Sequence, residues 1–235
     1  LLPAGQYYID GYPAELSPIE SQKFILEFAI TWGLASYSYD RYKKDKKTLP
    51  ILAVPNESLA ENALKTISSI YLVRDMINCP ASDLMPKDIS NIVDDLSKNH
   101  PGIAAKHIIG DDLLTQNFPT IHAVGRASIH EPRLIDFTWG NPSHPKVTLV
   151  GKGVCFDSGG LDLKPASAMR NMKKDMGGSA HVLGLASLII QYNLPIRLRV
   201  LIPAVENAIS SNAFRPGDVL TTRQGLTVEV DNTDA

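Results

Sequence analysis

Charged side chains that could do chemistry gather in one glycine-rich stretch of the sequence, residues 147–180. Lys152 and Asp157 follow an apolar run there, and a second charged cluster ends in Asp175. Six glycines are spaced through residues 151–178, and glycine permits positive φ and a close approach of the backbone to a bound group. This stretch is therefore expected to form a shaped site rather than an ordinary surface loop.

Several acids of the chain are expected to converge, because ligands of α/β sheets collect beyond the carboxyl ends of the strands. Asp157, Asp175, Asp231 and Asp234 all follow a predicted strand or begin a predicted helix. Buried carboxylates repel one another, and a bound divalent cation usually compensates their charge. Oxygen ligands suit Mg, Mn or Zn better than a soft thiolate site does. The alternative is that these acids cap helices and turns. Their spacing alone does not decide between the two interpretations.

The sequence does not match other common catalytic and phosphate-binding motifs. Lys152 lacks the glycine and the hydroxyl residue of a phosphate-binding P-loop, and Phe156 occupies the third glycine position of a dinucleotide fingerprint. Ser158 does not lie in a GxSxG elbow. Cys155 has no base placed beside it, which argues against a nucleophile. His181, alone in its predicted helix, is expected to be structural rather than a metal ligand.

The elements that must position these residues follow from the apolar periodicity. Predicted helices cover residues 19–37, 56–78, 86–99 and 178–193. Predicted strands cover residues 49–54, 104–109, 121–124, 134–139, 147–150, 197–202 and 227–230, with a possible short strand at 7–9. Such an alternation is typical of a mixed or parallel sheet flanked by helices. The fold class predicted from it is α/β, with a mixed central sheet.

Composition limits the classes of partner. The 235 residues are 44% hydrophobic and 20% charged, which predicts a globular chain. A net charge of -2 gives no electrostatic reason to expect nucleic acid or an anionic membrane as partner. The sequence predicts neither a membrane span nor a secretory leader. Cys79 and Cys155 are expected to be reduced, which fits a cytoplasmic location. The chain opens at Leu1 and stops at Ala235 without a terminating feature, so truncation is expected at its C-terminal side.

Five motifs occur in one order over about residues 130–235: VGKGVCFDSGGLDLKP, MKKDMGGSAHVLG, IPAVENA, RPGDVL and VEVDNTDA. Together they resemble the leucyl (cytosol) aminopeptidase family of dinuclear metallopeptidases. Weaker landmarks of the same family lie upstream, at SYDRYK, RDMINCPAS and AVG. The resemblance favours the metal interpretation over helix capping. It implies that residues 49–235 are the N-terminal part of the metallopeptidase catalytic domain, and that residues 1–48 are the end of an N-terminal domain with a linker helix.

The resemblance also implies roles for individual residues. Lys152, Asp157, Asp175 and Asp234 are the implied ligands of two divalent ions, with Asp157 bridging both, and Lys164 is the implied catalytic lysine. Mn or Zn is expected, with Mg or Co open. A lysine amine, whose ordinary pKa is about 10.4, can bind a metal only when neutral, and a bound dication drives that deprotonation. Lys164, by contrast, is expected to stay charged and to polarise the scissile carbonyl.

The implied activity is removal of N-terminal residues, leucine among them, from peptides with a free N-terminus. A water activated by two ions would attack the first peptide bond, in a homo-hexamer. The family motif continues beyond NTDA with a glutamate and an arginine, so these 235 residues alone are expected to be inactive. The alternatives are a non-catalytic DNA-binding or scaffold role of the same fold, and a nucleotide-binding domain. The failed phosphate motifs argue against the latter.

Overall fold

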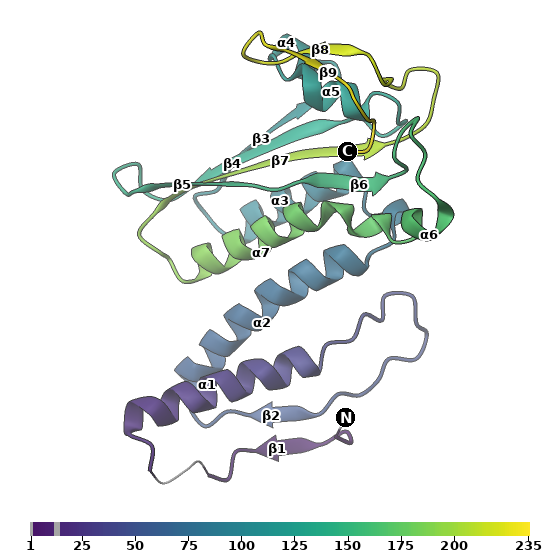
Figure 1. The fold of residues 1–235 in the computed structure, drawn as a ribbon. Coiled ribbons are helices and arrows are strands. Elements are labelled where there is room, and N and C mark those ends of the chain that lie inside the picture. Colours follow the sequence, from purple (N-terminus) through teal and green to yellow (C-terminus); the bar gives the residue numbers. More distant parts are fainter. Residues whose placement is uncertain (1, 12–14) are drawn as a thin grey trace. The chain divides into compact units, whose positions relative to one another are not determined.

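A computed structural model describes residues 2–11 and 15–235 of the chain (Figure 1). The contacts divide the chain into two units, Leu1–Asp75 and Met76–Ala235. The family-derived boundary after residue 48 concerns the domains of a whole protein and stays a prediction. Within the described ranges, no helix combines the length and the apolar content that spanning a membrane requires.

The first unit contains two helices and a small parallel sheet. Helix α1 (Pro18–Ala35) begins with a capping box, in which the N–H groups of Glu20 and Ser17 are bound by each other's side chains. Strands β1 (Gln6–Tyr8) and β2 (Ile51–Ala53) pair in parallel. Helix α2 (Glu57–Asn78) begins in this unit and ends in the second. The helices and strands predicted here are confirmed to within a few residues at each end.

The second unit is built on a five-stranded mixed sheet, which confirms the predicted fold class. Its strands are β3 (Ala104–Ile109), β4 (Arg133–Trp139), β5 (Lys146–Val150), β6 (Gly153–Asp157) and β7 (Arg197–Asn207). Strand β4 lies antiparallel to β3 and to β7, whereas β5 and β6 both run parallel to β7. Strands β5 and β6 follow one another along the same neighbour. Lys152 therefore lies in the break between them, and Asp157 is the last residue of β6.

Helices cover both faces of this sheet (Figure 1). Helices α3 (Pro86–Asn99) and α7 (Gly177–Gln191) lie on one face. The other face carries α4 (Asp112–Thr115), α5 (Pro119–Gly125) and the hairpin of β8 (Val219–Thr221) and β9 (Thr227–Glu229). Short connecting helices are η1 (Ala81–Asp83), α6 (Ala166–Met169) and η2 (Met172–Met176). Asp175 therefore lies in the turn that leads into α7.

The strand predicted at residues 121–124 is wrong, because the structure has helix α5 there. Pro119 opens this helix at its first turn, a position that proline favours. A stretch of four residues is too short for its apolar period to separate a strand from a helix. Strand β6 lies outside the strands predicted from the sequence, because its first residue is a glycine in a glycine-dense stretch. Strand β7 also continues past Pro203, which lies opposite the break between β5 and β6.

Cys79 and Cys155 are buried and form no disulfide within the described part of the chain, as predicted. Burial raises the pKa of the Cys155 thiol, so thiolate is scarce at neutral pH. We expect neither cysteine to react with an aromatic disulfide reagent in native buffer over minutes, and both to react once the protein is unfolded in guanidinium. Rapid labelling of either cysteine in the native protein would contradict this burial.

Candidate metal centre

The structure brings the five predicted site residues to one end of the second unit, near the carboxyl end of β6. Lys152 lies in the break before β6, Asp157 is the last residue of β6, and Lys164 lies in the loop that follows. Asp175 lies in η2, and Asp234 lies in the segment after β9. Three ion pairs involve all five of them: Lys152 pairs with Asp175, and Lys164 pairs with both Asp157 and Asp234. Asp231, the other acid predicted after β9, is exposed.

Asp157 is the buried member of the group, with 1% of its surface exposed. Its Oδ1 accepts hydrogen bonds from the N–H of Gly159 and from Nδ2 of Asn207, both at 2.8 Å. Its Oδ2 is buried and has no hydrogen-bond partner among the described residues; it lies 3.8 Å from Nζ of Lys164. Burial raises the pKa of Asp157, and the neighbouring Asp234 carboxyl raises it further. One oxygen is thus held in place and the other is available to a ligand.

Lys164 joins Asp157 to the second carboxylate of the site, Asp234. Nζ of Lys164 donates to Oδ1 of Asp234 at 2.6 Å, and it also contacts the other oxygen of that carboxylate. This hydrogen bond raises the pKa of Lys164 and lowers the pKa of Asp234, so both groups are charged. Lys164 is therefore a cation beside two carboxylates, with only 13% of its side chain exposed.

Lys152 and Asp175 form the second charged pair. Nζ of Lys152 lies 3.0 Å from Oδ2 of Asp175 and also donates to the main-chain carbonyl of Ala235. Two glycines make the approach possible. A Cβ on Gly178 would lie 2.8 Å from the backbone nitrogen of Lys152, and a Cβ on Gly151 would lie 2.8 Å from the carbonyl oxygen of Gly178. Because neither residue has a side chain, the turn that carries Asp175 packs directly on the backbone of Lys152.

The donor chemistry fits divalent cations. Oδ2 of Asp157 and Oδ2 of Asp175 are buried oxygens that find no hydrogen bond among the described residues, although Asp175 makes its ion pair to Lys152. Such oxygens are costly unless a cation compensates them. Across residues 2–11 and 15–235, no three His, Cys, Asp or Glu side chains are grouped so as to hold a metal. The three acids of the predicted set therefore do not form a metal-binding group by themselves in this structure.

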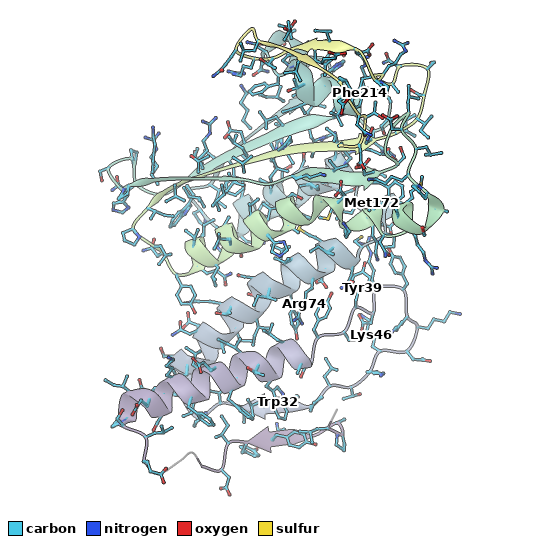
Figure 2. The ribbon with its side chains drawn as sticks, in the orientation of Figure 1. Trp32, Tyr39, Lys46, Arg74, Met172 and Phe214 are labelled. Carbon is cyan, nitrogen blue, oxygen red and sulfur yellow. The ribbon has the colours of Figure 1, made fainter. Side chains whose placement is uncertain are left out.

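The sequence did not reveal the side chains that hold these loops together. Asn207 ends β7 and is 1% exposed, and Thr233 directly precedes Asp234 and is fully buried. Thr233 donates its hydroxyl to the carbonyl of Gly159 at 2.7 Å, and its N–H donates to Oδ2 of Asp162 at 2.9 Å. Sequence patterns identify polar residues at the ends of strands, but they do not identify partners that lie far along the chain. Met172 begins η2 and is partly exposed (Figure 2).

Comparison with known proteins finds matches over most of this chain. Residues 71–235 match the family model described as "Cytosol aminopeptidase family, catalytic domain". A probable cytosol aminopeptidase from Chlamydia abortus is 39% identical over 220 residues, which are 88% of this chain and 44% of that protein. The crystal structure of cytosol aminopeptidase from Coxiella burnetii superimposes with a TM-score of 0.90 at 46% identity, over 100% of this chain and 50% of that one.

A second solved structure carries a metal in its description. The bottromycin maturation enzyme BotP in complex with Mn matches with a TM-score of 0.87 at 32% identity. The match covers 99% of this chain and 50% of that one. The chain thus spans about half the length of the relatives that it matches.

Proposed function

The chain belongs to the cytosol aminopeptidase family, and from this premise we propose that the full-length protein is a metal-dependent aminopeptidase. It would hydrolyse the N-terminal peptide bond of peptides with a free N-terminus, with leucine among the residues released. The observation that carries the proposal is the buried Asp157 carboxylate. Its Oδ1 is anchored by hydrogen bonds, and its Oδ2 has no hydrogen bond among the described residues and lies 3.8 Å from Nζ of Lys164.

Lys152, Asp157, Asp175 and Asp234 would hold two divalent ions, with Asp157 shared between them. Ions at such a site, when bound, supply a water of lowered pKa and polarise a carbonyl oxygen. The described complex of BotP with Mn supports Mn as the first ion to test, and Zn, Mg and Co remain candidates. Lys152 would contribute its nitrogen in the neutral form, because an ammonium group has no lone pair to donate.

Lys164 would act on the substrate rather than on the ions. Its hydrogen bond to Asp234 keeps its pKa above the ordinary value, so the amine carries a proton at neutral pH. A charged donor fixed beside the reacting carbonyl stabilises the negative charge that develops on its oxygen. The low exposure of Lys164 strengthens this effect, since less water competes for the ammonium group.

The wider setting of the activity is proposed with it. We propose a cytoplasmic enzyme that assembles as a homo-hexamer, as the resemblance implies. A DNA-binding or scaffold role of the same fold is the alternative. The net charge of -2 argues against a role dominated by phosphate contacts, and no arrangement in the described residues favours it.

The test is hydrolysis of leucine p-nitroanilide by the full-length protein. We expect activity to vanish after dialysis against a chelator and to return with Mn, because the proposed chemistry needs the ions. N-acetyl-leucine p-nitroanilide is the matched control and should stay uncut, since it lacks the free amine. A protein that leaves a panel of N-terminal residues uncut when loaded with Mn, but binds duplex DNA with a steep salt dependence, would contradict the proposal.

A further inference from the structure

One buried amide connects two segments of the site that come from distant parts of the chain. Nδ2 of Asn207 donates to Oδ1 of Asp157 and to the main-chain carbonyl of Thr233, each at 2.8 Å. Asp157 ends β6, and Thr233 is the residue before Asp234, so the amide reaches two of the proposed ligand segments at once. Asn207 itself is fixed by its place in the sheet, where it is the β7 partner of Asp157.

The backbone of Asn207 strengthens the same link. Its carbonyl oxygen accepts hydrogen bonds from the N–H of Ser158 at 3.1 Å and from the hydroxyl of Ser158 at 2.8 Å. The loop that leaves β6 is therefore attached to the end of β7 at the residue directly after Asp157. Asn207 is 1% exposed, so its amide is shielded from bulk solvent and its two acceptors depend on it in the folded protein.

The oxygen of the same amide argues against a role in stability alone. Oδ1 of Asn207 is buried and finds no hydrogen-bond partner among the residues described. It packs against Gly160, where a Cβ would lie 3.1 Å from it. An unsatisfied buried oxygen costs free energy, and such exceptions collect at functional sites. The orientation of the amide is thus set by the two hydrogen bonds that Nδ2 donates, because in the flipped orientation Oδ1 would face the Asp157 carboxylate.

We propose that Asn207 is a positioning residue of the metal centre, which sets the direction of the Asp157 carboxylate and joins it to the segment that carries Asp234. The inference rests on the proposed function. Two donors, Gly159 N–H and Asn207 Nδ2, hold Oδ1 of Asp157 and leave Oδ2 to face Lys164. With the amide removed, one donor remains, and the carboxylate can rotate about its last bond. Groups that orient metal ligands in this way are typically worth tenfold to a hundredfold in metal affinity or activity.

The test compares Asn207→Ala with Leu198→Ala in the full-length protein. Leu198 is fully buried on the same strand, and nine residues place it about 30 Å from Asn207 along the strand. Mn affinity is measured by titration, with free Mn detected by electron paramagnetic resonance, alongside the melting temperature, kcat and KM for leucine p-nitroanilide. We expect Asn207→Ala to weaken Mn binding tenfold to a hundredfold and to lower kcat more than it changes KM. Leu198→Ala should lower the melting temperature and leave Mn affinity within twofold.

Asn207→Ser provides the second variant if the alanine variant does not fold. Its hydroxyl is too short to reach both acceptors, so a similar loss of Mn affinity is expected. If either folded variant bound Mn with an affinity within twofold of wild type, Asn207 would not be a positioning residue. The proposed function would still stand in that case, provided that the wild-type protein is active. A wild-type protein that neither binds Mn nor cleaves the substrate would overturn both proposals.

Discussion

Asp157→Asn in the full-length protein is expected to lower kcat/KM for leucine p-nitroanilide by about a thousandfold or more. The substitution keeps the size of the buried side chain but removes its negative charge. It also replaces one carboxylate oxygen, so that Oδ2, which has no hydrogen bond among the described residues, is no longer available as a charged ligand. Metal ions contribute several kcal/mol to the stabilisation of charge in such reactions, and each 1.36 kcal/mol corresponds to a factor of ten in rate. Steady-state kinetics in excess Mn, with the bound metal counted by mass spectrometry, measures both effects.

The matched control is Asp136→Asn, on β4. Asp136 is also an acid on the same sheet, but its partner is Arg199, which donates to it at 2.6 Å. It belongs to no part of the proposed site, so the variant should retain activity within about twofold of wild type, since exposed ion pairs are worth about 0.2–1 kcal/mol. If Asp157→Asn kept its bound metal and a comparable rate, Asp157 would not be a ligand.

Lys164→Ala is expected to lower kcat by about a hundredfold to a thousandfold while the protein retains its bound metal. The variant removes the charged donor proposed to stabilise the developing oxyanion, and the loss of one such donor has about this effect. KM should change less than kcat, because the interaction strengthens only as charge develops in the transition state. The measurement is kcat and KM at saturating Mn, with metal content determined on the same sample.

Lys146→Ala supplies the control for the loss of a lysine. Lys146 begins β5 and is exposed, at the end of the strand away from Lys152. It should leave both constants near the wild-type values. The Lys164→Ala protein could instead lose its metal and regain activity at a higher Mn concentration. That result would show that Lys164 supports metal binding and does not stabilise the transition state.

The sequence predicts the helices that have long apolar stripes. Helices α1, α2, α3 and α7 were predicted because each repeats its apolar period over several turns. Helix α5 was missed, because its few apolar residues fit either period and Pro119 was the only strong signal. Strand β6 was missed, because it begins with glycine and its nearly uniform burial leaves no alternation of apolar and polar residues. Its existence depends on the distant strand β7.

The residues of the candidate site were predicted individually from the sequence, but the side chains that hold them in place were not. Lys152, Asp157, Lys164, Asp175 and Asp234 stand in motifs whose order is specific, and the structure places them within reach of one another. Their assigned roles stay proposals. Asn207 could not be identified in the same way. Its importance lies in two hydrogen bonds to residues far from it in sequence, and no local pattern encodes such a pairing.

The most direct test of the metal centre is a crystal structure of the full-length protein loaded with Mn, with data collected at the Mn absorption edge. The account predicts two anomalous peaks roughly 3.5 to 4 Å apart, with Asp157 between them. Nζ of Lys152 and Asp175 should contact one peak and Asp234 the other. Crystals that show no peak at the carboxyl end of β6, with the ion pair of Lys152 and Asp175 intact, would contradict it.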